Sequence, residues 1–166
     1  TIDWSMNVTE LRNGTIDLLW NGYSITPERQ KKVAFSKPYL RNRQVIVVKK
    51  DSGISSFKQM KNYELGMQTG STAEQWYETK QDVLHAKKTV LYDTISNSFL
   101  DLNAGRIQGI LLDEVYADYY IAHMAKSSEY KVIQNDRVPM DLFAVGMRKG
   151  DKTLRQKVNQ GLARLQ

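Results

Sequence analysis

One short segment of the chain places an arginine and a serine beside a predicted helix start. Thr26 can cap the helix, Pro27 fits its first position, and Glu28 suits the positive end of the helix dipole. Arg29 offers a planar fork of donors that meets both oxygens of a carboxylate, and Ser24 can add a hydroxyl or amide donor. The segment therefore predicts a carboxylate-binding site. The alternative is a capped turn in which Arg29 forms a surface ion pair.

A second segment, Gly70, Ser71 and Thr72, is a glycine turn that leads into a predicted helix. Free backbone amides, the helix dipole and the small hydroxyl groups would together form an anion site there. Ordinary helix capping is the alternative interpretation.

A third position is Asp113, which follows the apolar residues 110–112 at the end of a predicted strand. The carboxyl ends of parallel strands are where α/β proteins bind ligands. Asp113 can also cap the next helix, and the two roles are compatible. The three segments together supply the groups that a zwitterion needs. The carboxylate of such a ligand would meet Arg29 and the amides around Ser24 and Thr72, and its ammonium group would meet Asp113 and the Gly22 carbonyl.

The composition is that of a soluble globular protein, with 41% hydrophobic and 25% charged residues in 166. The formal net charge is +6, but the basic residues are spread in ones and twos without interleaved aromatics. This pattern predicts a solvated basic surface and no nucleic-acid partner.

Catalytic and metal-binding chemistry have little support in the sequence. The chain has no cysteine, and His85 and His123 lie outside any metal-ligand spacing. It contains no nucleophile elbow, phosphate loop or paired histidine and carboxylate motif. We therefore predict no catalytic residue, no metal and no cofactor.

The hydrophobic pattern alternates strands with helices, which predicts an α/β protein with parallel sheets covered by helices. A helix is expected over residues 6–13, and a β-branched run at 44–48 predicts a strand buried on both faces. The other expected strands are 16–20, 64–68, 90–92, 110–113, 130–133 and 142–147, and the other expected helices are 55–60, 73–83, 94–104, 114–125 and 152–165. A helix, glycine and strand unit recurs at residues 11–19 and 102–112, which favours two lobes of similar construction. No low-complexity linker divides them, so hinge strands are expected near 44–48 and 142–147.

Several sequence blocks carry a resemblance to a known family. They are LRNGTID at 11–17, NGYSITPER at 21–29, FSKPY at 35–39, GST at 70–72, AGRI at 104–107 and LD at 112–113. In this order they resemble the polar amino-acid solute-binding proteins of ABC transporters, which are the bacterial extracellular solute-binding proteins of family 3. The resemblance extends from the first residue to the last.

The resemblance implies a periplasmic-binding-protein-like fold of type II, a venus flytrap with two lobes. Lobe one would comprise residues 1–45 and 141–166 and would be incomplete, because members of the family extend beyond both ends of this chain. Lobe two would comprise residues 46–140. The ligand-binding residues that the resemblance implies are Asn21, Gly22, Ser24, Arg29, Gln68, Ser71, Thr72 and Asp113.

The implied function is capture of a free polar amino acid between the lobes and its delivery to the membrane permease of an ABC importer. Such a protein would be a monomer, located in the periplasm or lipid-anchored on the outer face of the cytoplasmic membrane. Gln68, Asn21 and Trp20 favour a polar ligand side chain and leave open glutamine, histidine, arginine or another amino acid. The alternatives are the ligand-sensing ectodomain of a receptor and a dehydratase on the same fold.

Overall fold

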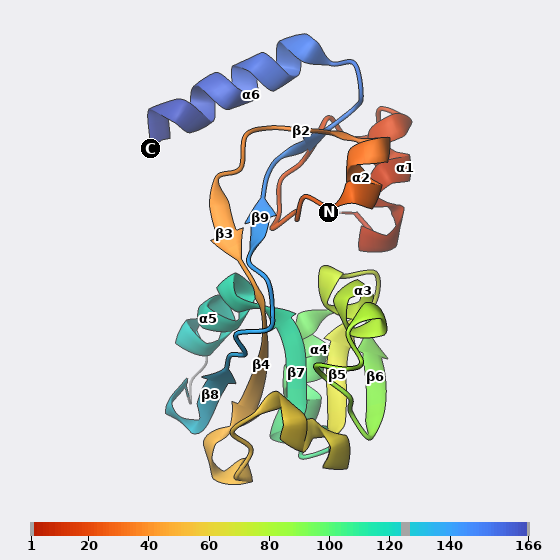
Figure 1. The fold of residues 1–166 in the computed structure, drawn as a ribbon. Coiled ribbons are helices and arrows are strands. Elements are labelled where there is room, and N and C mark those ends of the chain that lie inside the picture. Colours follow the sequence, from red (N-terminus) through yellow and green to blue (C-terminus); the bar gives the residue numbers. More distant parts are fainter. Residues whose placement is uncertain (1, 124–126, 166) are drawn as a thin grey trace. The chain divides into compact units, whose positions relative to one another are not determined.

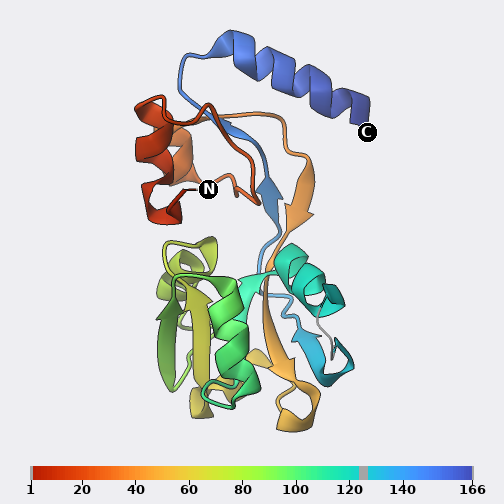
Figure 2. The same cartoon turned by 180° about the vertical axis from the view of Figure 1, so that it is seen from behind.

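The computed structural model describes residues 2–123 and 127–165. The chain forms two compact units, drawn in Figures 1 and 2. Unit 1 comprises Thr1–Asn42 and Met140–Gln166, and unit 2 comprises Arg43–Pro139. The chain therefore enters unit 2 after Asn42 and leaves it after Pro139.

Unit 2 contains a five-stranded sheet in the order β6-β5-β7-β4-β8. Its strands are β4 (Gln44–Lys49), β5 (Glu64–Gln68), β6 (Lys88–Tyr92), β7 (Gly109–Asp113) and β8 (Tyr130–Ile133). β5 runs parallel to β6 and β7, whereas β4 runs antiparallel to both β7 and β8. The expectation of a parallel sheet is therefore confirmed for β5, β6 and β7 and is wrong for the pairings of β4. Alternating hydrophobicity locates strands but does not encode their direction, and β4 pairs with strands that are distant from it in the sequence.

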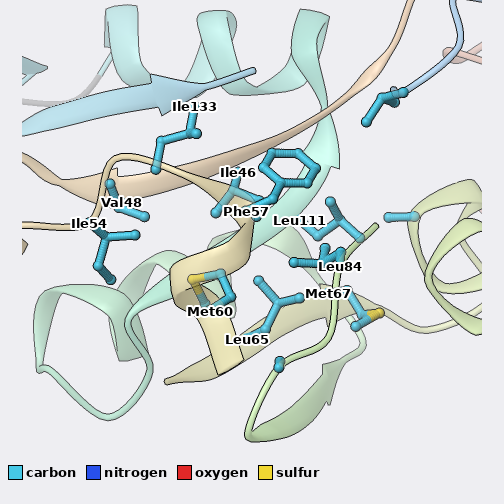
Figure 3. Close-up of a cluster of buried hydrophobic side chains, with 13 residues drawn as sticks. Ile46, Val48, Ile54, Phe57, Met60, Leu65, Met67, Leu84, Leu111 and Ile133 are labelled. Carbon is cyan, nitrogen blue, oxygen red and sulfur yellow. The ribbon is translucent and has the colours of Figure 1, made fainter. Parts of the chain in front are cut away.

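The expected burial of β4 on both faces is confirmed, since Val45 to Val48 are fully buried. Ile46 and Val48 belong to a cluster with Phe57, Met60, Leu65, Met67 and Leu111, shown in Figure 3. Val45 and Val47 belong to the opposite cluster, which includes residues of α4 (Ile95–Asn103) and α5 (Glu114–His123). Figure 2 shows α4 in front of the sheet. The alternation of side chains along the strand thus supplies both halves of the core.

Two of the helices predicted for unit 2 differ in length or in helix type. α3 (Thr72–Thr79) ends four residues before the expected end at 83, and residues 80–83 form turns instead. The helix expected at 55–60 is the 3₁₀ helix η3 (Phe57–Asn62), which has a capping box formed by Ser56 and Gln59. Two further 3₁₀ helices are η2 (Lys50–Ser52) and η4 (Ser127–Glu129). The expected end of α5, at 124 and 125, lies outside the described residues.

The strands described in unit 1 are short and pair antiparallel, so the expectation of a parallel sheet is wrong for this unit. β1 (Leu18–Leu19), β10 (Gly146–Met147) and β2 (Ala34–Phe35) form one sheet, and β3 (Leu40–Asn42) pairs with β9 (Asp141–Phe143). The strand expected at 142–147 is thus divided into β9 and β10, which pair with different partners. The strand expected at 16–20 is reduced to β1.

The helices of unit 1 are η1 (Trp4–Met6), α1 (Asn7–Arg12), α2 (Pro27–Lys32) and α6 (Lys152–Leu165). Gly14 follows α1 with a φ of 77°, the left-handed conformation that commonly ends a helix. The core of this unit contains Leu11, Leu19, Tyr23, Val33, Phe35 and Ala144. No helix in the described part of the chain is long and apolar enough to cross a membrane.

Candidate functional site

The start of α2 holds Arg29 as the sequence predicts. The Thr26 hydroxyl accepts a hydrogen bond of 3.1 Å from the Arg29 backbone amide, and Pro27 occupies the first helical position. The Arg29 side chain points inward and is only 7% exposed. This burial contradicts the alternative of a surface ion pair and places a guanidinium group inside unit 1.

Two neighbours within unit 1 fix the Arg29 guanidinium group. Nη1 donates a hydrogen bond of 3.1 Å to the backbone carbonyl of Ser24, and the guanidinium carbon lies 4.4 Å from the centroid of the Tyr23 ring. The Tyr23 ring is itself held in place by Trp4 and Phe35, at centroid distances of 5.7 and 5.4 Å. Burial raises the pKa of the Tyr23 hydroxyl, and the charge of Arg29 partly offsets this effect.

Ser24 is fully buried, which the sequence did not reveal. Residues around it run antiparallel to the segment containing β9, because the Ala144 amide donates to the Tyr23 carbonyl and the Ile25 amide donates to the Leu142 carbonyl. The Ser24 Oγ has no hydrogen-bond partner among the described residues. Ser24 thus contributes its carbonyl to Arg29 and retains a buried hydroxyl group.

The two other predicted residues of unit 1 precede Tyr23. Asn21 is exposed, and Gly22 has a φ of 56°, a left-handed conformation that suits glycine. They form the turn between β1 and the Tyr23 segment.

Asp141 is a charged residue near Arg29 that the sequence reasoning missed. It begins β9, and burial raises the pKa of its carboxyl group while the positive charge of Arg29 partly lowers it. The pattern gave no signal for this proximity, because Asp141 and Arg29 come from opposite ends of the chain.

In unit 2, the turn before α3 is capped by its own side chains. The Ser71 Oγ accepts a hydrogen bond of 3.3 Å from the Glu74 amide and donates one of 2.6 Å to the Gln68 carbonyl. The Gly70 amide, which was a predicted anion donor, donates a hydrogen bond of 2.5 Å to the Glu74 carboxylate. The capping interpretation is therefore confirmed, and Glu74 occupies one amide of the predicted anion cradle.

Asp113 ends β7, is 9% exposed and lies beside two uncharged side chains. The Gln44 Nε2 donates a hydrogen bond of 2.6 Å to the Asp113 Oδ1, and the Thr72 hydroxyl lies 3.5 Å from the same oxygen. The Gln44 Nε2 also lies 3.3 Å from the Thr72 Oγ1. Side chains from β4 and α3 thus reach the carboxylate at the end of β7, and Gln44 is a member of this group that the sequence reasoning missed.

Gln68 ends β5 and is partly buried. Its Nε2 donates a hydrogen bond of 3.0 Å to the Asp93 carbonyl, which ties it to the segment after β6. Unit 2 therefore contains two linked pairs of predicted residues. Gln68 contacts Ser71 through its carbonyl, and Thr72 contacts Asp113.

The described residues contain no group of three or more His, Cys, Asp or Glu side chains that could hold a metal ion. His85 Nδ1 lies 2.8 Å from Gln81 Oε1, and His123 Nδ1 lies 2.7 Å from the Tyr119 carbonyl. Among the described residues, Arg29 supplies a buried guanidinium group in unit 1 and Asp113 supplies a buried carboxylate in unit 2. Each can bind a ligand group of opposite charge.

The mixed α/β architecture is that of the periplasmic binding proteins, as solved structures of this class show. A substrate-binding protein of an ABC uptake transporter from Streptococcus pneumoniae, solved with bound histidine, matches with a TM-score of 0.91 and 42% identity. This match covers 99% of the chain and 68% of that structure. An ancestral arginine-binding protein bound to arginine matches with a TM-score of 0.84 and 30% identity, covering 99% of the chain and 72% of that structure. The predicted fold class is confirmed.

All of residues 1–166 match the bacterial extracellular solute-binding proteins, family 3, and the chain belongs to this family. The ABC transporter arginine-binding protein 1 of Escherichia coli (strain K12) is 30% identical over 161 residues, which cover 94% of the chain and 63% of that protein. The arginine-binding extracellular protein ArtP of Bacillus subtilis (strain 168) is 29% identical, over 99% of the chain and 64% of its own length. The chain thus spans less than two thirds of these two relatives. The family is one of extracellular solute-binding proteins.

Proposed function

We propose that this chain captures a polar amino acid outside the cytoplasm as the solute-binding component of an ABC importer and delivers it to the membrane permease. Membership of an extracellular solute-binding family supports this function. The relatives named above are arginine-binding proteins, and the structure from Streptococcus pneumoniae holds histidine. A free amino acid with a polar or cationic side chain is therefore the ligand class that we propose.

The observation that carries the proposal is a buried charge of opposite sign in each unit, held by nearby polar or aromatic groups. In unit 1, Arg29 is oriented by the Ser24 carbonyl and the Tyr23 ring. In unit 2, Asp113 is oriented by Gln44. A guanidinium fork suits the α-carboxylate of an amino acid, and a carboxylate suits its α-ammonium group. Because binding to groups that are already oriented loses less conformational entropy, this arrangement favours tight binding.

The other predicted residues complete the proposed ligand contacts. Ser24 and Thr72 would add donors, and the Gly22 carbonyl would accept from the ammonium group. Asn21, Gln68 and Ser71 would contact the rest of the ligand. The Ser71 hydroxyl donates a hydrogen bond to the backbone carbonyl of Gln68, so these two residues belong to the same turn of unit 2.

The proposed lobes are residues 1–45 with 141–166 and residues 46–140, joined by hinge strands near 44–48 and 142–147. The division of the chain into two compact units supports the two lobes of this proposal. We also propose that the protein is a monomer, located in the periplasm or lipid-anchored on the outer face of the cytoplasmic membrane.

Isothermal titration calorimetry against the twenty amino acids tests the proposed function. We expect one amino acid to bind strongly, with a dissociation constant in the micromolar range or lower. This corresponds to a standard binding free energy of about −8 kcal/mol or more negative. Circular dichroism of the same sample controls for folding. A folded protein that binds none of the amino acids would contradict the proposal.

A further inference from the structure

Gln44 is a fully buried polar residue opposite Asp113. It is the first residue of β4 and is 1% exposed. In the antiparallel pairing of β4 with β7, Gln44 is the direct register partner of Asp113. Cross-strand partners project their side chains to the same face of a sheet, so the backbone pairing brings the amide and the carboxylate together.

The hydrogen bonds of Gln44 are directed toward this carboxylate. Its Nε2 donates a hydrogen bond of 2.6 Å to the Asp113 Oδ1 and lies 3.3 Å from the Thr72 Oγ1. An ionised carboxylate only accepts hydrogen bonds, so a neighbour that fixes its orientation must be a donor. The amide group of Gln44 meets this requirement without adding a charge that would compete with a cationic ligand group.

Gln44 also carries an energetic cost that stability alone does not explain. Its Oε1 is buried and has no hydrogen-bond partner among the described residues. A buried acceptor without a partner destabilises a folded protein, whereas an apolar side chain of similar volume would leave no such atom. The amide donor toward Asp113 is the feature that an apolar residue would lack.

We propose that Gln44 is a positioning residue that fixes the Asp113 carboxylate for the ammonium group of the solute. This inference rests on the proposed function, because it assigns Gln44 to the ammonium-binding part of the same site. Loss of the Gln44 donor would remove one of the hydrogen bonds that orient the Asp113 carboxylate, and ligand binding would have to supply the lost restriction. Gln44 thus sets how strongly the protein distinguishes an amino acid from an analogue that lacks the amino group.

The test compares the amino acid identified by calorimetry with its des-amino analogue, in which hydrogen replaces the amino group. In the Gln44→Met variant, which keeps the length of the side chain but removes its amide, we expect amino-acid affinity to fall about tenfold or more. Affinity for the des-amino analogue should stay within about twofold of wild type. In an Asp113→Asn background, Gln44→Met should cause little further loss, since the role of Gln44 is exerted through Asp113.

Gln108 provides a matched control within the same unit. Its Nε2 donates to the Gly105 carbonyl and its Oε1 accepts from the Glu64 amide. Gln108→Met removes these structural hydrogen bonds, so we expect a lower melting temperature with an unchanged preference for the amino acid over its analogue. If Gln44→Met does not fold, Gln44→Asn replaces it in the test. Asparagine keeps the amide group on a shorter side chain, and we expect this variant to reduce the preference for the amino acid over its des-amino analogue.

The possible results separate this inference from the proposed function. Wild-type binding with an unchanged preference in both Gln44 variants would overturn the role of Gln44 and leave the proposed function intact. Equal losses for the amino acid and its analogue, together with a lower melting temperature, would overturn it as well, because they indicate a structural role only. Failure of the wild-type protein to bind any amino acid would overturn both proposals.

Discussion

Arg29 and Tyr23 form a cation–π pair in unit 1, with 4.4 Å between the guanidinium carbon and the centroid of the ring. Such a pair contributes about 0.5 to 2 kcal/mol, depending on its exposure to water. Because the Ser24 carbonyl accepts a hydrogen bond from Nη1, the guanidinium plane is constrained from a second direction. Arg29 is therefore oriented by contacts within its own unit.

Replacing Arg29 tests its role as the carboxylate-binding group. We expect Arg29→Ala to lower amino-acid affinity by about 2 to 5 kcal/mol, because the ligand carboxylate would lose its charged partner. Arg29→Lys should recover only part of this loss, since an ammonium group lacks the planar fork. Arg12→Ala, at an exposed position of α1, is the control and should bind normally. Unchanged calorimetric affinity in Arg29→Ala would exclude this role for Arg29.

A substitution at Gly146 tests whether the position of the Tyr23 ring matters for Arg29. A Cβ atom at Gly146 would lie 2.8 and 2.9 Å from two carbon atoms of the Tyr23 ring, so Gly146→Ala must displace this buried ring. We expect a loss of about 1 to 3 kcal/mol in the free energy of unfolding. We also expect weaker amino-acid binding, because the Tyr23 ring that contacts Arg29 moves. Urea denaturation and calorimetry measure the two effects.

The control for this variant is Gly161→Ala in α6. A Cβ atom there would meet nothing within 4 Å, and alanine is favoured over glycine inside a helix by about 0.5 to 1 kcal/mol. This variant should be stabilised and should bind normally. A stable Gly146→Ala protein with normal affinity would show that the position of the Tyr23 ring does not matter for binding.

The parts of the site that the sequence predicted depend on local rules. Thr26 was predicted as a cap, and capping was the alternative interpretation of residues 70–72. Capping needs only neighbouring amides, and Thr26 and Ser71 both form caps. The carboxylate of Asp113 was predicted from its place at the end of an apolar strand, and the buried run of β4 was predicted from its β-branched residues.

The parts that the sequence did not predict depend on pairing between distant segments. Gln44 acquires its role only when β4 lies antiparallel to β7, and strand direction is not encoded in the hydrophobic pattern. Asp141 comes near Arg29 only when the two ends of the chain fold into one unit. The position of Tyr23 in the core likewise depends on Phe35 and Gly146, which no local motif identifies.

Asp113→Asn tests the ammonium-binding group, because it keeps the shape of the side chain and removes its charge. We expect amino-acid affinity to fall by about 1.5 to 3 kcal/mol, which is the contribution of a hydrogen bond to a charged group. Affinity for the des-amino analogue should change much less. Asp118→Asn, at an exposed position of α5, is the control. If Asp113→Asn lowered only the melting temperature, Asp113 would be a structural residue rather than a ligand contact.

Asp141 makes the stability of the protein depend on pH in a defined direction. Burial raises the pKa of its carboxyl group above the ordinary value of 3.8, so the folded state binds this proton more tightly than the unfolded state does. The contribution of the protonated group to stability is therefore complete below about pH 3.8, and it is lost as the pH rises through the folded-state pKa. Above that range, the protein contains a partly buried carboxylate whose desolvation is only partly offset by Arg29.

The Asp141→Asn variant isolates this contribution, since asparagine has a similar shape and does not titrate. We expect Asp141→Asn to be more stable than wild type at neutral pH, and the difference should shrink as the pH falls toward 3.8. Urea denaturation of both proteins between about pH 3.5 and 7.5 measures it, and Asp118→Asn, in which an exposed carboxylate is removed, corrects for the change in net charge. A neutral-pH loss of stability in Asp141→Asn would mean that the attraction of Arg29 for the carboxylate outweighs desolvation, which reverses the sign of this effect.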